Sequence, residues 1–204
     1  ITEKQKEYIK KDISEFEQVL YGKNFSDKRI GYQAYIDMDN WVDYFIINEF
    51  AMNYDAGNLS TYLYKELGGK LQLAIWDFNN GFDNYQWFRT ETDVLHTVEN
   101  SWFKRLWQDE TFREHVCERY RQLRKTTLAD EHIAEKIASY QEELGDAVDR
   151  NFKVWGYSFD EALLAGTSKD GTSRDIRSYE EAMKQLTDTI RERLAYLDKE
   201  LGGN

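Results

Sequence analysis

The sequence predicts a mainly α-helical fold with one small β-hairpin. Apolar residues recur at helical spacing over most of the 204 positions. Two β-rich runs flank the turn signal Gly68-Gly69. The chain also contains no proline, where average usage of about 5% would give roughly ten. Long helices tolerate this composition best, because proline breaks a helix interior.

Two helices are expected before the hairpin. Thr2 and Gln5 form a capping box, which predicts a helix that stops at Gly22. Either Asp37 or Asp39 is expected to cap the next helix. The apolar residues of this second helix cover nearly its whole circumference, so we expect it to be central and buried.

The hairpin is expected to join strands over Thr61–Glu66 and Lys70–Trp76. We expect Lys65 and Lys70 to be solvated charges on its edges. Trp76 and Phe78 are expected to lie in the core.

Helices are expected again after the hairpin, and residues 156–177 are expected to form a loop. Asp109 and Asp130 are the expected caps of two of these helices. Ser178 and Glu181 form a second capping box, which opens a final helix. The helix that Asp130 begins is expected to turn one apolar stripe inward, composed of Ile133, Ile137, Tyr140, Leu144 and Val148. No linker clearly divides the chain, so residues 1–204 are expected to form a single domain.

Composition excludes several kinds of partner. The formal net charge is −11, which argues against nucleic acid, because binding of phosphates needs a basic face. No apolar run approaches the roughly 18 residues that a membrane helix needs, so no membrane insertion is expected. Cys117 is the only cysteine, which rules out a disulfide within the chain.

Two aspartates at the ends of the predicted hairpin are the strongest candidates for chemistry. Asp55 follows the buried helix, and Asp77 follows the second strand. A hairpin brings its two ends together, so both carboxylates are expected to face one small volume, with Asn58, Asn79 and Asp83 nearby. Such a set suits a divalent cation and the base-plus-metal layout of phosphoryl transfer.

Other segments of the sequence resemble known binding sites only in part. Residues 77–83 carry oxygen ligands on alternate positions, as a calcium loop does. They depart from the EF-hand pattern, because glycine falls one place early and position twelve is Phe88. A structural Ca²⁺ site stays open as the alternative. The three histidines lack zinc-ligand spacing. Residues 166–173 have no lysine at the position that a phosphate-binding loop requires, and they do not follow a strand.

The run from Tyr35 to Asn84 resembles the spore-coat CotH kinase family. Its matching residues are Ile36-Asp37, Trp41-Val42-Asp43-Tyr44-Phe45, Asn53, Asp55, Tyr62-Leu63-Tyr64-Lys65, Gly69-Lys70-Leu71 and Trp76-Asp77-Phe78. The later pieces that fit the family are Trp102-Phe103, Phe112, Arg119-Tyr120, Trp155 and Arg193-Leu194-Ala195-Tyr196-Leu197-Asp198. The resemblance implies a fold like the C-terminal lobe of a protein kinase.

The resemblance also implies roles for individual residues. Asp55 matches the catalytic aspartate that accepts the proton of the substrate hydroxyl, and Asp77 matches the metal-binding aspartate. Asn58, Ser60 and Asn79 are the candidate ligands of a second metal ion or of water. The implied reaction is transfer of the γ-phosphoryl group of ATP, with Mg²⁺ or Mn²⁺, to Ser or Thr of a coat or surface protein. The implied location is the spore coat or the cell surface.

The sequence departs from the family pattern at two of these positions. Asn79 stands where the family usually has aspartate, and Ser60 stands where it usually has asparagine. Both changes remove charge or ligand strength from a metal site. An N-terminal, nucleotide-binding lobe of the same gene product is expected to precede Ile1 as a partner. The alternative function is a catalytically degenerate module that keeps the scaffold for protein interaction, with or without bound Ca²⁺.

Overall fold

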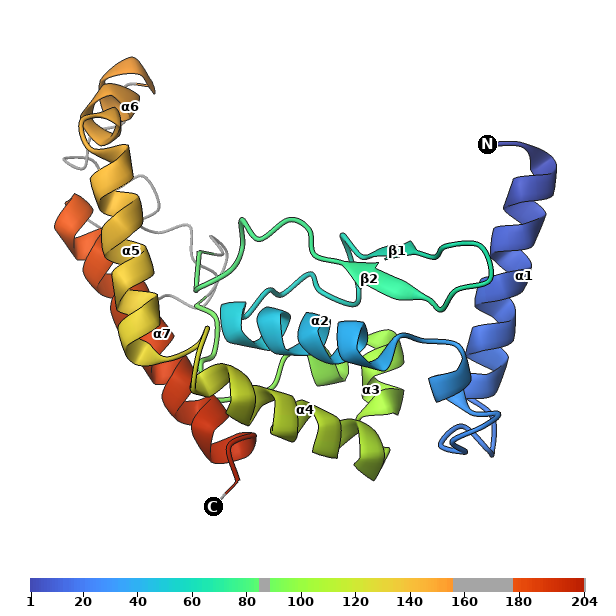
Figure 1. Ribbon diagram of the computed structural model, residues 1–204. Helices are drawn as coiled ribbons and strands as arrows, with labels where there is room; N and C mark the ends of the chain where they lie inside the picture. The colour runs from blue at the N-terminus through green and yellow to red at the C-terminus, as the bar shows by residue number, and fades with distance from the viewer. Residues whose placement is uncertain (85–88, 156–177, 204) are drawn as a thin grey trace. The chain divides into compact units, whose positions relative to one another are not determined.

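The computed structural model describes residues 1–84, 89–155 and 178–203 (Figure 1). These residues form mainly helices with one two-stranded antiparallel sheet, which confirms the predicted fold class. They divide into two compact units, Ile1–Phe78 with Leu95–Cys117, and Asn79–Val94 with Glu118–Asn204. The single domain over residues 1–204 stays a prediction. The loop predicted over residues 156–177 and Phe88 lie outside the described residues.

Helix α1 (Glu3–Leu20) opens the first unit with the predicted capping box. The Thr2 hydroxyl accepts a hydrogen bond from the Gln5 N–H at 3.2 Å, and the Gln5 side chain accepts one from the Thr2 N–H at 2.8 Å. Residues 1–11 are exposed, and burial begins only at Phe16 and Leu20. The C-terminal half of α1 therefore attaches the helix to the core.

Helix α2 (Met38–Ala51) is the central buried helix that the sequence predicts. Asp37, and not Asp39, caps it, because the Asp37 carboxylate accepts a hydrogen bond from the Asn40 N–H at 3.2 Å. Its aromatic residues pack against α3 (Ser101–Leu106). The ring of Phe103 lies 5.5–5.8 Å from the rings of Trp41, Tyr44 and Phe45.

The hairpin consists of β1 (Tyr62–Tyr64) and β2 (Gln72–Ala74), which are shorter than predicted. Gly68 has φ of +75°, as the predicted turn requires. The Asn40 side chain holds β2 on α2, because it donates to the Leu73 carbonyl at 3.1 Å and accepts from the Leu73 N–H at 2.7 Å. The Trp41 indole N–H adds a third bond, to the Leu71 carbonyl at 2.9 Å. Figure 1 shows the hairpin lying along α2.

Two expectations about hairpin side chains are wrong. Trp76 is 60% exposed and packs against the exposed ring of Tyr62, at 5.5 Å, instead of entering the core. The reason is that Trp76 lies beyond the end of β2 at Ala74, where Ile75 is also exposed, so this segment has left the core that buries Leu71 and Leu73. Lys65 is not simply solvated, because its ammonium pairs with the Asp12 carboxylate of α1 at 2.6 Å.

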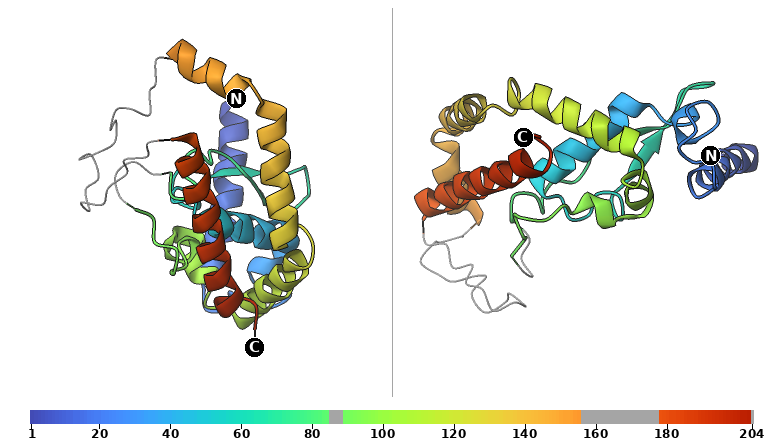
Figure 2. Two further views of the ribbon diagram at one scale, coloured as in Figure 1. Left: turned by 90° about the vertical axis from the view of Figure 1, so that its left-hand side faces the viewer. Right: turned by 90° about the horizontal axis from the view of Figure 1, so that it is seen from below.

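The second unit contains α5 (Asp130–Leu144), α6 (Ala147–Trp155) and α7 (Tyr179–Glu200), and α4 (Glu110–Arg124) runs from the first unit into it. Helices α5 and α7 lie side by side (Figure 2) and line a shallow apolar groove. Ser178 caps α7 as predicted, because its hydroxyl accepts a hydrogen bond from the Glu181 N–H at 3.0 Å.

The helix predicted to begin at Asp130, which is α5, is corrected in three respects. It breaks at Gly145, where φ is +42°, instead of running through Val148. Ala129 occupies the cap position that was expected for Asp130. Tyr140 and Leu144 are 59% and 50% exposed instead of turned inward. A helical stripe of apolar residues predicts the face of a helix, but it does not show whether another element covers that face.

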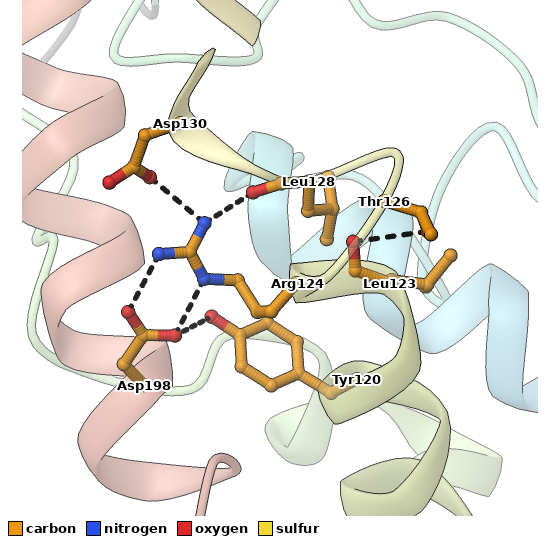
Figure 3. Close-up of polar contacts among 7 residues, drawn as sticks. All are labelled: Tyr120, Leu123, Arg124, Thr126, Leu128, Asp130 and Asp198. Carbon is orange, nitrogen blue, oxygen red and sulfur yellow. Dashed lines mark hydrogen bonds and ion pairs between the residues drawn. The ribbon is translucent and has the colours of Figure 1, made fainter. Parts of the chain in front are cut away.

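The Arg124 guanidinium joins three parts of the second unit (Figure 3). It binds the Asp198 carboxylate of α7 through two hydrogen bonds of 2.8 and 3.0 Å. It also donates to the Asp130 carboxylate at 2.9 Å and to the Leu128 carbonyl. The Tyr120 hydroxyl donates to Asp198 at 2.8 Å. Burial and the hydrogen bond to Asp198 raise the pKa of Tyr120. Burial lowers the pKa of Arg124, but the bonds to Asp198 and Asp130 outweigh it and raise the pKa.

Candidate functional site

The loop between α2 and β1 carries Asp55 in a tight turn. Helix α2 ends at Met52, which has a left-handed φ of 51° and so redirects the chain. The Asp55 carbonyl accepts hydrogen bonds from the Asn58 N–H at 3.2 Å and from the Leu59 N–H at 2.8 Å. Gly57 is buried with φ of +77°, and a Cβ there would lie 3.3 Å from the Phe103 ring. Glycine lets the loop pass close to the core, while Asp55 stays half-buried.

Ser60 and Asp77 meet at the open end of the hairpin. The Ser60 hydroxyl donates a hydrogen bond to the Asp77 carboxylate at 3.1 Å. The pairing of Tyr62 with Ala74 accounts for this contact, because it keeps the two segments of the chain next to each other where they leave the strands. The hairpin thus brings Ser60 to Asp77, and the approach of Asp55 to Asp77 stays a prediction.

Both residues of this pair have left-handed backbone conformations. Ser60 has φ of 43° and Asp77 has φ of 60°. A residue with a Cβ loses about 1–3 kcal/mol in such a conformation. Backbone strain of this kind is concentrated at functional sites, where the position of a side chain matters more than local stability. Asp77 is exposed, so its carboxylate is accessible to a ligand.

The remaining predicted ligands lie on exposed loops. Asn58 is exposed in the same loop as Asp55 and Ser60. Asn79 belongs to the second unit, where its side chain donates to the Asn80 side chain at 3.2 Å and its carbonyl accepts from the Asn84 side chain at 2.8 Å. The structure therefore joins Ser60 to Asp77 directly and places Asp55 and Asn58 on one loop with Ser60.

The oxygen atoms of the pair suit a hard divalent cation. In residues 1–84, 89–155 and 178–203, no three His, Cys, Asp or Glu side chains form a metal cluster. Mg²⁺ does not require one, because it is commonly held by one or two carboxylates together with water and substrate phosphates. The Asp77 carboxylate and the Ser60 hydroxyl fit that pattern.

Asp83 was expected beside the two aspartates, but its carboxylate has another role. Asp83 is 5% exposed and accepts a hydrogen bond from the Thr90 N–H at 2.6 Å. The Arg89 guanidinium approaches the same carboxylate at 3.9 Å. These contacts stabilise the loop of the second unit, and they compete with any cation for the oxygens of Asp83.

Sequence reasoning missed the buried polar groups at the end of α2. Glu49 is fully buried, and its carboxylate accepts hydrogen bonds from the N–H groups of His96 at 3.1 Å and Thr97 at 2.5 Å. It thereby anchors the 3-10 helix η2 (Thr97–Glu99) to α2. Asn48 and Asn53 are also buried. The available signal was the presence of Asn48 and Glu49 in a helix whose apolar residues cover nearly its whole circumference.

A buried helix, an acidic loop, a short hairpin and a second aspartate follow one another in this chain. This is the order of elements expected for the C-terminal lobe of a kinase-related protein. A family model described as CotH kinase protein matches residues 1–197, and the chain belongs to this family. Neither the curated proteins nor the solved structures gave a match.

Family membership points to ATP with a divalent metal as the general cofactor, and the family name points to the spore coat. Within the part of the chain that the structure describes, no helix has both the length and the apolar character needed to cross a bilayer.

Proposed function

We propose that this chain is the catalytic-lobe part of a CotH-like atypical protein kinase. The reaction is transfer of the γ-phosphoryl group of ATP, with Mg²⁺ or Mn²⁺, to Ser or Thr of a coat or surface protein. The observation that carries the proposal is the hydrogen bond between Ser60 and Asp77 at the open end of the hairpin. This bond brings the Asp77 carboxylate to the Ser60 hydroxyl, which belongs to the loop that also carries Asp55, and so supports a metal-binding role for Asp77.

Each residue has a stated role in this proposal. Asp55 accepts the proton of the substrate hydroxyl as that oxygen attacks phosphorus. Asp77 would hold the metal ion, which would supply charge neutralisation for the phosphates of ATP. Asn58, Ser60 and Asn79 hold a second ion or water. The Ser60 hydroxyl donates its hydrogen to Asp77 and keeps its lone pairs available to a cation or to water.

The partners follow from the same proposal. The protein substrate is a coat or surface protein, and the location is the spore coat or another extracytoplasmic surface. An N-terminal lobe of the same gene product supplies the remaining contacts to the nucleotide. The net charge of −11 disfavours nucleic acid as a partner.

A second candidate function is a degenerate interaction module, with or without bound Ca²⁺. Two observations favour it. Ser60 and Asn79 stand where the family has stronger metal ligands. Trp76 and Tyr62 form an exposed aromatic pair on the hairpin, which suits contact with another protein.

The deciding experiment is Mg²⁺-dependent ATP turnover and autophosphorylation in the full-length protein and in its Asp77→Ala variant. We expect turnover in the wild type and its loss in Asp77→Ala. The matched control is Glu66→Ala, which removes an exposed carboxylate from the same hairpin and is expected to leave turnover unchanged. Turnover that survives Asp77→Ala would remove this residue from the metal site. Calorimetry with Ca²⁺ and no nucleotide tests the second candidate, which predicts heat of binding.

A further inference from the structure

A short relay of buried amides connects the last turns of α2 to the loop that carries Asp55. The Asn48 side-chain NH₂ donates to the Tyr44 carbonyl at 2.7 Å. The Asn48 side-chain oxygen accepts from the Asn53 side-chain NH₂ at 3.0 Å. Asn48 is 1% exposed and Asn53 is 3% exposed. Two primary amides, one in the last turn of α2 and one directly after its C-cap Met52, are thus paired with each other in a buried environment.

Asn53 uses its backbone as well as its side chain to hold the loop. Its N–H donates to the Asn48 carbonyl at 3.0 Å, and its carbonyl accepts from the Ala56 N–H at 3.1 Å. The first bond closes a turn that includes Met52, and the second closes a turn that includes Asp55, at the point where the chain leaves the helix. Three hydrogen bonds of one residue therefore fix the direction of the chain directly before Asp55.

Stability alone does not explain this arrangement. An apolar pair of the same shape is often as stable as a buried hydrogen-bonded pair, because polar groups must give up water. The relay is also incomplete. Among the residues that the structure describes, the Asn53 side-chain oxygen is buried without a hydrogen-bond partner. A pair that costs desolvation and leaves an acceptor unused is better explained by the geometry it imposes.

We propose that Asn48 and Asn53 are positioning residues that hold Asp55 in the orientation that phosphoryl transfer requires. The inference rests on the proposed function, since Asp55 needs positioning only if it acts as the base. Neither asparagine touches the reacting atoms. Asn53 sets the turn, and Asn48 fixes Asn53 to the helix backbone.

The test replaces Asn53 by leucine, which has the same branched shape and number of side-chain heavy atoms, although a larger volume, and removes the amide. We expect kcat for ATP-dependent transfer to fall on the order of 10²-fold, because a small displacement of a catalytic group has an effect of that size. The KM for Mg·ATP is expected to stay within about twofold of wild type, because Ser60 and Asp77 are untouched. Asn53→Ala removes the same amide without adding volume and serves as the second variant if Asn53→Leu folds poorly.

The matched control is Tyr32→Phe, which removes a different buried hydrogen bond of the same unit, the 2.7 Å bond to Asp109. This variant is expected to lower stability and leave kcat per folded molecule unchanged. If Asn53→Leu and Tyr32→Phe lower kcat equally, the amides have only a structural role and the positioning proposal is wrong.

A second readout does not depend on activity. The N–H groups of Ala56 and Leu59 are bonded to the carbonyls of Asn53 and Asp55, so their hydrogen exchange reports the order of the loop. We expect exchange at both to accelerate at least about tenfold in Asn53→Leu and to stay unchanged in Tyr32→Phe. Unchanged exchange in Asn53→Leu overturns the proposal. An inactive wild type with accelerated exchange in Asn53→Leu instead overturns the kinase assignment and leaves the relay as the device that orders this loop.

Discussion

Replacing Arg124 with methionine is expected to lower the free energy of unfolding by about 3 kcal/mol. Methionine keeps much of the apolar stem of arginine, so the change mainly removes the polar contacts that Arg124 makes in Figure 3. Those contacts tie the end of α4 to α5 and α7 within the second unit.

The magnitude follows from the exposure of each partner. The Arg124 side chain is 20% exposed and that of Asp198 is 44% exposed, so their two hydrogen bonds are partly screened. We assign them about 2 kcal/mol together, which is below the value for fully buried charged bonds. The bond to the Leu128 carbonyl adds about 1 kcal/mol. The Asp130 side chain is 72% exposed, so its pair contributes no more than about 0.5 kcal/mol.

Urea unfolding and thermal unfolding, both followed by circular dichroism, measure these differences. Arg124→Met is expected to lower the midpoint of thermal unfolding by about 6–12 °C, given about 2–4 °C per kcal/mol for a chain of this size. Asp130→Ala is the control that removes only the exposed partner, and it is expected to change stability by less than about 0.5 kcal/mol. Equal losses in the two variants, or a loss below about 1 kcal/mol in Arg124→Met, would refute the reasoning.

Three further predictions concern the first unit. Ser60→Asn restores the residue usual in the family and is expected to tighten Mn²⁺ binding severalfold in a titration followed by electron paramagnetic resonance; weaker binding would contradict the role of this position. Burial, followed by the hydrogen bond to Asp109, raises the pKa of Tyr32 above its ordinary value of 10.0. The stability from this neutral hydroxyl is therefore present below pH 10 and falls above it, by up to about 1.4 kcal/mol per pH unit, and Tyr32→Phe should flatten the alkaline limb of a stability profile. Lys65→Met leaves the partly buried carboxylate of Asp12 unpaired and is expected to cost about 1–2 kcal/mol in urea unfolding, whereas a cost near zero would mean that the pair does not hold the hairpin to α1.

The sequence could predict the elements whose signals are local. The cap of α1 at Thr2, the buried character of α2 and the turn at Gly68 depend on residues a few positions apart, and all three are confirmed. Burial was harder to predict, because it depends on what lies opposite. Trp76 and Tyr140 have core-like side chains, but both are exposed among the described residues, because no element covers most of their surface.

The candidate site was predictable in the same uneven way. The approach of Ser60 to Asp77 follows from the register of one hairpin. The buried contacts of Glu49 were not predictable, because its partners His96 and Thr97 lie 47 and 48 residues away and are backbone groups. Backbone donors leave no mark in the sequence. The amide pair of Asn48 and Asn53 was hidden for a different reason, since buried polar residues next to a helix end resemble ordinary loop residues.

The proposed function assigns the role of base to Asp55 and the role of metal ligand to Asp77, and one comparison tests these two roles most directly. In the full-length protein, Asp55→Asn and Asp77→Asn are compared for binding of Mg·ATP and for transfer of the γ-phosphoryl group in a single turnover. We expect Asp55→Asn to bind Mg·ATP as the wild type does and to transfer on the order of 10²-fold or more slowly. Asp77→Asn is expected to lose metal-dependent binding. Transfer at the wild-type rate in Asp55→Asn, or undiminished Mg·ATP binding in Asp77→Asn, would contradict the account.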